Sequence, residues 1–327
     1  MKRREFLVVL GATAIDWSDS ALAQPSGKLY RLGTLTPAGP LSANSPDASV
    51  LLSALAERGY ALGRNFAYDA RASGGDNSKL PELLQDFKAS GIDALVTLGY
   101  PAALAAKAAG IPTVVAAGAG DPVATGLVAS LARPGGTITG ISDDATSLST
   151  KRLSLLKELL PRFGRIAMLW NADDLGMSLR YEASAAAARS IGITVQPLGV
   201  REPNDFAAAF AAMDREPPDA ILMVADALTN LNRKRVFDYA AAKRLPAIYE
   251  SDPHVRTGGL MSYGADRKES FQRAASMVDR IFKGARPADL PFEQPTRYRF
   301  VINLATAKAT GLEISPKLLA LADEVIE

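Results

Sequence analysis

The stretch 91–122, GIDALVTLGYPAALAAKAAGIPTVVAAGAGDP, constrains the fold more than any other part of the chain. Its apolar run 93–98 is too short for a helix and is typical of a strand buried on both faces of a sheet. Pro101 then opens a predicted helix, where its missing N–H costs nothing, and that helix ends at Gly110. A second short strand follows at 111–115. The stretch therefore predicts a βαβ unit, and open α/β sheets bind ligands at the carboxyl ends of such strands.

The same order of elements occurs a second time. The matching segments are 31–36 with 165–170, 93–98 with 219–224, and 111–115 with 245–249. Ala225-Asp226 stands in the second copy where Gly99-Tyr100 stands in the first. Two α/β domains can share such an order of strands and helices without common ancestry, because buried strands use few residue types. The spacing nevertheless predicts an α/β protein of two doubly wound parallel-sheet lobes joined by crossing segments.

Periodicity and turn signals divide the chain into lobes. We expect the N-terminal lobe at 28–143 plus about 266–286, and the C-terminal lobe at 144–265 plus about 287–327. The predicted strands are 29–36, 65–72, 93–98, 111–115, 137–141, 165–171, 194–200, 219–225, 247–250, 259–264 and 298–303. The predicted helices are 46–58, 80–90, 101–110, 149–160, 177–191, 205–213, 230–243 and 266–283, with two short helices towards the end of the chain.

The composition is that of an ordinary globular protein. The chain has 327 residues, 48% hydrophobic and 22% charged, enough for two separate cores. A net charge of +2, with no Lys/Arg-dense stripe, gives no reason to expect nucleic acid as a partner. The absence of cysteine excludes disulfides and thiolate metal sites, and a single histidine, His254, argues against a histidine metal cluster or a Ser-His-Asp triad. We expect neither a cofactor nor a bound metal.

Residues 1–23 have the three-part layout of a secretory signal peptide. Residues 2–4 are basic, residues 6–15 form an apolar stretch too short to span a bilayer, and small residues at 21–23 precede the predicted cleavage site. The run Arg3-Arg4-Glu5-Phe6-Leu7 also resembles the twin-arginine export motif. We expect an exported, periplasmic and monomeric protein that does not insert into the membrane.

Turns after the predicted strands bring polar and aromatic side chains to one cleft if the two lobes face each other. The candidate ligand-binding residues are Thr36, Pro37, Tyr100, Pro101, Asp121, Asn171, Asp226, Tyr249, Glu250 and Tyr263.

The polar candidates each have a second interpretation. Backbone N–H groups at the helix start near Pro101 can take a ligand carboxylate, since a helix N-terminus favours anions, or Pro101 merely starts a helix. Asp121 and Asp226 can accept hydrogen bonds from a ligand amino group. Equally, Asp121 can cap a turn, and Asp226 can cap the helix that begins near Thr229.

The aromatic candidates lie near strand ends. Tyr100, Tyr249 and Tyr263 can supply the apolar area with a polar tip that pockets for small organic ligands use. Trp170 is expected in the wall or the core, and His254 in a surface loop. No G-x-G-x-x-G or Walker pattern occurs, so the glycine pairs are interpreted as turns.

Several long phrases resemble one known family from end to end. They include PAALAAKAAG-IP, AGDPVATGLVASLARPGG-TITG, KRLSLLKELLP, RIAMLWN, RLPAIYE, GGLMSYG and INLATAKATGLEISPKLLALADEVIE. The chain is similar to the periplasmic substrate-binding proteins of ABC transporters, of the tryptophan/tyrosine-binding type. The resemblance implies a type I periplasmic-binding-protein fold, three crossings between lobes, and a ligand held between them.

The sequence departs from that family pattern in the loops that would touch ligand. Tyr100 stands where small hydroxyl residues are common, and 250–254 replaces a loop usually richer in Gly, Phe and Arg. The region 40–50 is atypical as well. The resemblance therefore implies the scaffold more firmly than the substrate.

Residues and resemblance together predict a non-catalytic receptor that closes on a small organic ligand and delivers it to an ABC permease. An aromatic amino acid or aromatic carboxylate is the favoured ligand. One alternative is a periplasmic ligand-sensing protein that docks on a signalling receptor. A less favoured alternative is an exported hydrolase, for which no G-x-S-x-G motif is present.

Overall fold

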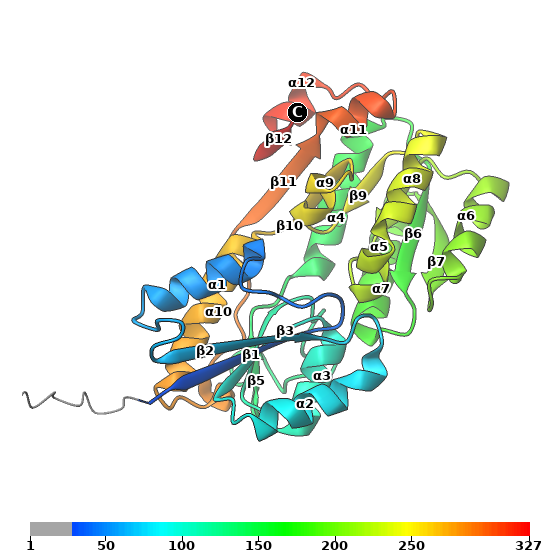
Figure 1. Ribbon diagram of the computed structural model, residues 1–327. Coiled ribbons are helices and arrows are strands. Elements are labelled where there is room, and N and C mark those ends of the chain that lie inside the picture. The colour runs from blue at the N-terminus through cyan, green and yellow to red at the C-terminus, as the bar shows by residue number, and fades with distance from the viewer. Residues whose placement is uncertain (1–27) are drawn as a thin grey trace, which may run out of the picture.

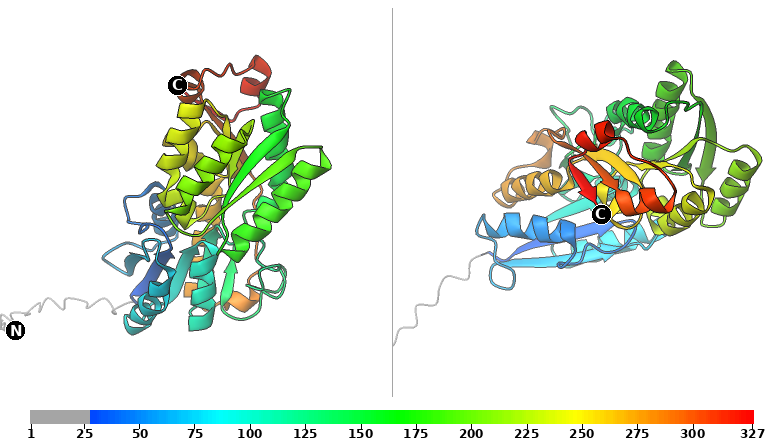
Figure 2. Two further views of the ribbon diagram at one scale, coloured as in Figure 1. Left: turned by 90° about the vertical axis from the view of Figure 1, so that its right-hand side faces the viewer. Right: turned by 90° about the horizontal axis from the view of Figure 1, so that it is seen from above.

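The computed structural model of the protein describes residues 28–327, with the side chains of residues 145 and 146 left aside. It has two lobes, the first below the second in Figure 1, and the C-terminus lies at the far end of the second lobe. The left view of Figure 2 shows the same stacking from the side. The signal peptide predicted at 1–23 lies outside the described residues.

The first lobe is built on a five-stranded sheet in the order β2-β1-β3-β4-β5, with every pair parallel. Its strands are β1 (Tyr30–Thr36), β2 (Phe66–Ala72), β3 (Ala94–Leu98), β4 (Thr113–Ala117) and β5 (Ile138–Gly140). Its helices are α1 (Pro46–Ala56), α2 (Leu80–Ala89), α3 (Tyr100–Ala109) and α10 (Arg267–Phe282), with the short 3-10 helix η1 (Asn77–Lys79) before α2.

Helices cover both faces of this sheet. Val96 packs with α1 and α10 on one face, and its neighbour Leu95 packs with α2 and α3 on the other. Successive residues of a strand point to opposite faces, so a strand covered on both sides is apolar throughout. This explains why β3 is a continuous apolar run rather than an alternating one.

The second lobe is built on a seven-stranded sheet in the order β12-β11-β10-β9-β8-β6-β7. Its strands are β6 (Arg165–Asn171), β7 (Thr194–Val200), β8 (Ala220–Met223), β9 (Ala247–Tyr249), β10 (Met261–Ala265), β11 (Tyr298–Asn303) and β12 (Glu324–Ile326). Its helices are α4 (Ala145–Leu159), α5 (Leu175–Ser190), α6 (Asp205–Arg215), α7 (Ala227–Leu231), α8 (Arg233–Lys243), α9 (Asp252–Arg256), α11 (Leu304–Ala309) and α12 (Pro316–Ala320).

The second lobe repeats the layered plan of the first. Met168 of β6 packs with α4 and α5 on one face of the sheet, and Leu169 packs with α6 and α8 on the other. The strands from β6 to β10 are parallel, whereas β11 pairs antiparallel with β10, and β12 is parallel to β11. The prediction of two doubly wound α/β lobes is confirmed.

Three details differ from the sequence prediction. Helix α4 begins at Ala145 rather than at Ser149, because the polar run before it continues the helix instead of forming a loop. The helix predicted at 230–243 is divided into α7 and α8 at Asn232, because Asp226 starts a separate turn of helix at Ala227. Helix α9 and strand β12 were not predicted, since both are too short to show a periodic pattern.

The chain crosses between the lobes after β5, after β10 and before β11. Helix α10 returns to the first lobe, where it lies beside α1 (Figure 1). The segment 287–293, which includes η2 (Pro287–Asp289), also contacts the first lobe, since the Thr139 hydroxyl donates to Leu290 O at 2.8 Å. Strand β11 then joins the second sheet. The lobe bounds predicted from the sequence remain a prediction.

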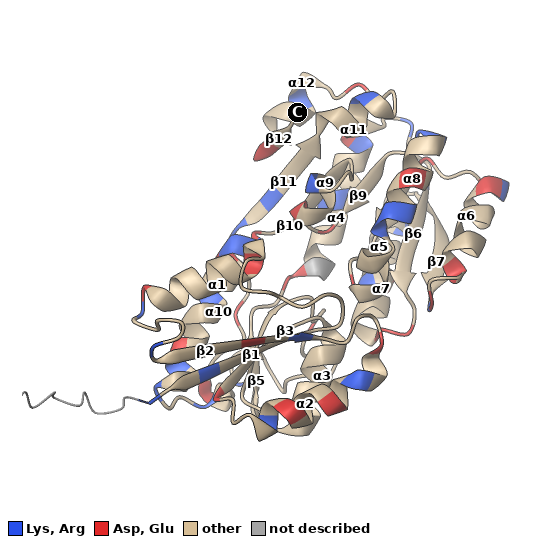
Figure 3. Ribbon diagram, in the orientation of Figure 1, with Lys and Arg blue, Asp and Glu red and all other residues tan. Residues whose placement is uncertain are grey.

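Charged residues of both signs are interspersed over the two lobes (Figure 3). Within residues 28–327, no helix is both long and apolar enough to cross a bilayer.

Candidate functional site

A cavity of about 300 Å³ lies between the lobes, at the carboxyl ends of their strands. From the first lobe it is lined by Thr36, Pro37, Ala38, Gly39, Leu41, Asp47, Leu98, Gly99, Pro101, Ala116, Ala117, Gly118, Arg267 and Ser270. From the second lobe and the crossings it is lined by Ser142, Asp143, Arg152, Asp174, Arg180, Ala225, Asp226, Ala227, Asn230, Glu250, Ser251 and Ala265. None of these lining residues in the described chain is aromatic.

The first lobe contributes a wall made largely of backbone. Gly99 follows β3 with a φ of +83°, a conformation that favours glycine, and it supplies no side-chain cap to α3. The first N–H of α3 with a partner is that of Ala103, which donates to Gly99 O. The N–H groups of Tyr100 and Ala102 therefore have no acceptor among the described residues. Unpaired N–H groups and the helix dipole make this end of α3 favourable for an anion.

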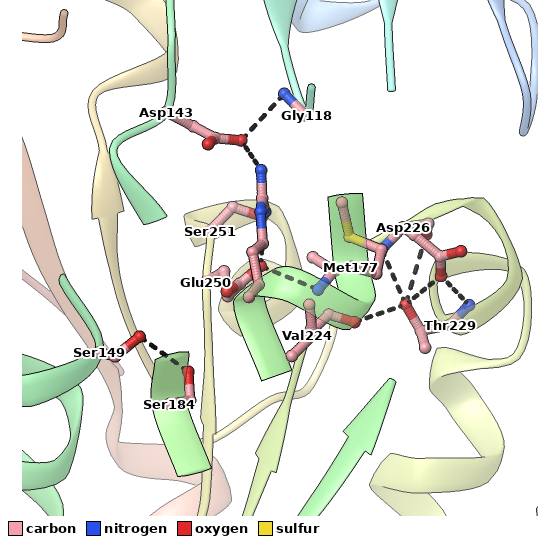
Figure 4. Close-up of polar contacts among 12 residues, drawn as sticks. Gly118, Asp143, Ser149, Met177, Ser184, Val224, Asp226, Thr229, Glu250 and Ser251 are labelled. Carbon is pink, nitrogen blue, oxygen red and sulfur yellow. Dashed lines mark hydrogen bonds and ion pairs between the residues drawn. The ribbon is translucent and has the colours of Figure 1, made fainter. Parts of the chain in front are cut away.

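The second lobe contributes a charged wall. Asp226 caps α7, since its Oδ1 accepts from the Thr229 backbone N–H at 2.8 Å and the Asp226 N–H donates to the Thr229 hydroxyl at 2.9 Å (Figure 4). Its Oδ2 accepts from Asn171 Nδ2 at 2.6 Å. The capping interpretation of Asp226 is confirmed, and the same carboxylate also lines the cavity. Capping and ligand contact therefore do not exclude each other.

A buried network of four charges supports this wall. Glu250 accepts from Arg152 at 3.2 Å and from Arg180 at 2.9 Å, and the Ala225 N–H donates to it at 3.0 Å. Arg180 also pairs with Asp143.

Asp143 ties this network to the first lobe. Its Oδ2 accepts from the backbone N–H of Gly118 at 3.1 Å (Figure 4). Gly118 lies just after β4, so the charges of the second lobe connect directly with the end of a first-lobe strand.

Electrostatics keep Glu250 ionised. Burial alone would raise its pKa, but the charges of Arg180 and Arg152 and the Ala225 N–H outweigh burial and lower it. Because Glu250 accepts from both arginines and from the Ala225 N–H, it holds the arginines in place in the wall of the cavity.

A second carboxylate in the wall has the opposite shift. Asp174 is buried beside α5, and burial, followed by the charge of Asp226, raises the pKa of Asp174 to about 6. Hydrogen bonds from the Met177 and Gly176 backbone and the charge of Arg180 oppose the rise without cancelling it. Asp174 therefore titrates near neutral pH in a wall shared with Asp226.

The cavity brings together half of the predicted site residues. Thr36, Pro37, Pro101, Asp226 and Glu250 line it. The others lie beside it or in the core: Tyr100, Asp121, Asn171, Tyr249 and Tyr263 are not among its lining residues. Asn171 is one contact away, through its bond to Asp226. Asp121 is exposed and accepts from Val123 N at 2.9 Å and from Ala124 N at 3.0 Å, so its interpretation as a turn cap is confirmed.

The three tyrosines do not line the cavity, although their positions near strand ends predicted that they would. Tyr249 is fully buried and stacks on His254, with ring centroids 5.3 Å apart. The expectation that His254 is a surface residue is wrong, because α9 folds it against Tyr249 in the core. Tyr100 is buried with its hydroxyl 3.4 Å from Thr125 O, and Tyr263 stacks on Tyr298 at 6.2 Å.

Sequence reasoning missed Asp143, Arg152, Asp174 and Arg180. One signal was available, since Arg152 occupies an apolar-face position in α4, one helical turn from Leu156. An arginine on the buried face of a helix requires an acidic partner, but the sequence does not say which one.

The chain matches the family of ABC transporter substrate binding proteins over residues 41–326. It belongs to that family. The crystal structure of an ABC domain in complex with L-Trp, from Streptococcus pneumonia, superimposes with a TM-score of 0.82 at 28% identity, covering 91% of this chain and 99% of that one. The fold is accordingly that of type I periplasmic binding proteins, as the resemblance implied.

Two further relatives extend the comparison. A tyrosine-binding protein of Clostridioides difficile (strain R20291) is 25% identical over 264 residues, which cover 80% of this chain and 75% of the relative. A ligand-free, open substrate-binding protein with adhesive properties from Clostridium difficile has the same fold, with a TM-score of 0.64 at 22% identity over 91% of this chain and 99% of that chain.

Proposed function

We propose that this member of the family is an exported, non-catalytic receptor that holds an aromatic amino acid or aromatic carboxylate between its lobes and delivers it to an ABC permease. The observation that carries the proposal is the pairing of two unlike walls across one cavity. The first lobe presents unpaired N–H groups at the start of α3, and the second presents the carboxylate of Asp226.

Such walls suit a ligand with an acidic and a basic end. The carboxylate of an amino acid would accept from the N–H groups of Tyr100 and Ala102, and its amino group would donate to Asp226. A ligand that touches both walls stabilises the closed arrangement, because only that arrangement satisfies both ends at once.

The aromatic part of the proposal rests on the relatives. The proteins similar to this chain include one crystallised with L-Trp and one named for tyrosine. The cavity is apolar around Leu41, Leu98 and Ala116, which can receive a ring.

A thermal-shift screen of the purified protein against amino acids, aromatic acids, short branched acids and sugars tests the proposal. Ligands that bind only the native state raise the melting temperature according to their excess over Kd. We expect shifts from tryptophan or tyrosine that shrink in Asp226→Ala. Shifts from sugars alone would reject the ligand class. Turnover of an ester panel would reject the non-catalytic assignment.

The transport step needs its own test. We expect cells that contain the protein and a cognate permease to take up labelled ligand, and cells without the protein to lose that uptake. Normal uptake without the protein would reject delivery to a permease. A signalling response without any uptake would favour the sensing alternative.

A further inference from the structure

A second cavity, of about 490 Å³, opens on the second lobe at the amino ends of its strands. The loops that precede β6, β8 and β9 meet there with the chain after α11, at the far end of this lobe (Figure 1). Asp219 lines this cavity and Ala225 lines the interlobe cavity, and the extended chain between them spans roughly 20 Å. The second cavity is therefore separate from the site between the lobes, and its volume is typical of small-molecule sites.

We call this second cavity the distal groove, and most of its lining is apolar and rigid. The apolar lining residues are Leu160, Pro161, Pro218, Leu245, Pro246 and Leu312. The prolines have a fixed φ, which leaves these loops little freedom. Leu160 and Leu312 also pack against the core on one face of the sheet, and Leu245 packs against the core on the other. The groove is therefore preformed, so a ligand need not order its walls.

Two cations lie in this apolar setting. Arg162 and Arg244 line the groove, and within residues 28–327 neither guanidinium has an ion pair or a hydrogen bond to another residue. The groove has one acidic lining residue, Asp219, which accepts from the backbone N–H groups of Gly164 and Arg165 at 2.8 Å each. The lining therefore carries a net positive charge.

Other basic side chains near the groove do have acidic partners. The pairs are Arg165 with Glu216, Lys243 with Asp214, and Lys317 with Glu158. The surrounding surface thus supplies carboxylates to its other cations. The two arginines of the groove are left to an acceptor from outside the described chain.

Arg244 also has an unusual backbone conformation. It ends α8 with a φ of +53°, in the left-handed region, which is costly for a residue with a Cβ. Helix α3 ends in the same conformation with a glycine, Gly110, at a φ of +69°. Lys243 already places a positive charge in the last turn of α8, so the helix dipole does not require Arg244. A strained arginine in place of a glycine indicates a role for its side chain.

We propose that the distal groove is a second binding site, for a small amphiphilic carboxylate whose apolar body lies on the leucines and prolines and whose anionic end pairs with Arg162 and Arg244. The proposal goes beyond the receptor function, because the interlobe cavity takes no part in it.

The chemistry of the groove selects this class of ligand. A guanidinium matches the geometry of a carboxylate and can bond to both of its oxygens. A neutral or cationic amphiphile would cover the apolar walls but leave both arginines without an acceptor. A stable protein interface covers about 800 Å² on each partner, whereas a concave cavity of this volume suits a small molecule.

Calorimetric titration with octanoate, 1-octanol, octylamine and acetate tests the site. We expect octanoate to bind, and the alcohol and the amine to bind weaker by about tenfold or more, because neither supplies an anion. Acetate should also bind weaker, because it lacks the apolar body. The affinity for octanoate should fall when the salt concentration rises from about 20 mM to about 500 mM, since salt screens the charges.

Arg162→Gln and Arg244→Gly are the decisive variants. We expect each to weaken octanoate binding by about tenfold or more. Because Arg244→Gly relieves the backbone strain, the melting temperature of the unliganded variant should not fall, so unfolding cannot explain a loss of binding. Arg286→Gln removes the same charge from an exposed pair outside the groove and is the matched control, which should bind octanoate like the native protein.

Each outcome decides for or against the groove. Octanoate binding that is unchanged in both variants, or matched by 1-octanol, overturns the proposal. Preference for an acetylated and amidated Leu-Asp-Leu-Glu-Leu peptide over octanoate overturns it in favour of a protein partner. A dimer in sedimentation that is lost in Arg244→Gly overturns it in favour of a second copy of the chain. Loss of octanoate binding with an unchanged thermal response to amino acids supports the groove and leaves the receptor function standing.

Discussion

The two lobes use one topological position in opposite ways. After β3 in the first lobe, Gly99 opens α3 without a side-chain cap, and the N–H groups of Tyr100 and Ala102 have no acceptor among the described residues. After β8 in the second lobe, Asp226 opens α7 with a reciprocal capping box. Both positions line the same cavity. Equivalent turns therefore give one wall that donates hydrogen bonds and one that accepts them.

Backbone conformation accounts for the difference. Gly99 has a φ of +83°, and a Cβ added there would lie 3.1 Å from Pro37 Cγ, so this turn excludes a side chain. Asp226 has an extended backbone, with a φ of −139°, that any residue can adopt. The comparison teaches that repeated architecture does not imply repeated chemistry, because one torsion angle determines whether a strand end presents main chain or side chain.

The largest expected effect comes from the charges beneath the second wall. Glu250→Gln removes the carboxylate that pairs with both Arg152 and Arg180, so that Asp143 is the acidic partner that remains among the described residues. The substitution should lower the free energy of unfolding by about 3 kcal/mol or more. Urea unfolding near neutral pH measures the loss.

The matched control for Glu250 is an exposed pair. Glu216 bonds to Arg165 with its side chain 67% exposed, so Glu216→Gln should cost less than about 1 kcal/mol. Equal effects of the two substitutions would mean that the second wall does not depend on its buried charges.

The next effect concerns the contact that brings the walls together. The lobes meet at Gly176, where an added Cβ would lie 3.3 Å from both Ala119 O and Tyr100 Cβ of the first lobe and 3.2 Å from Asp174 Oδ1 of its own lobe. Gly176→Ala should weaken ligand binding by about tenfold, because crowding there opposes closure. The unliganded protein should keep its stability, since alanine favours the helix.

Gly164→Ala is the control for this closing contact, because its added Cβ would meet only Asp219 Oδ2 at 3.7 Å. Titration calorimetry compares the two variants. Unchanged affinity in Gly176→Ala would show that the walls need not approach this closely to hold ligand.

A smaller effect is the pH dependence of stability, which is expected from Asp174 of the second wall. The folded-state pKa of Asp174, about 6, lies above the ordinary value for aspartate, so the stability contributed by its protonation is present in acid and lost as pH rises through about 6. Asp174→Asn removes this loss. Without ligand, the variant should exceed the native protein by about 1–3 kcal/mol at about pH 8, with the difference shrinking towards about pH 4. A difference independent of pH, followed by urea unfolding, would contradict this assignment.

The smallest effect is expected from a carboxylate that belongs to neither wall. Asp121→Ala removes an exposed turn cap and should cost about 1 kcal/mol or less. Ligand affinity, measured by the same titration, should not change. Loss of binding would return Asp121 to the ligand site and place an acceptor on the donor wall.

Local pattern was sufficient for most of the architecture. The segments 165–171, 194–200 and 298–303 form strands with the predicted bounds, because their signals lie within a few neighbouring residues. The cap at Asp226 could be predicted from the sequence for the same reason, since a helix cap depends on residues one turn away. The sequence by itself thus determined two α/β lobes and several of the strand ends that face the cavity.

Tertiary structure alone determined which side chains face that cavity. Arg152 meets Glu250 across 98 residues of sequence, a pairing that no local pattern encodes. Tyr249 ends a strand, yet its side chain packs in the hydrophobic core on one face of the sheet. Its position at a strand end therefore gave a wrong prediction of cavity contact. Asp174 acquired its properties from burial and from Asp226, both of which exist only after folding. Dielectric environment and long-range contacts are properties of the assembled chain, and for that reason the sequence by itself did not give the charged wall of the cavity.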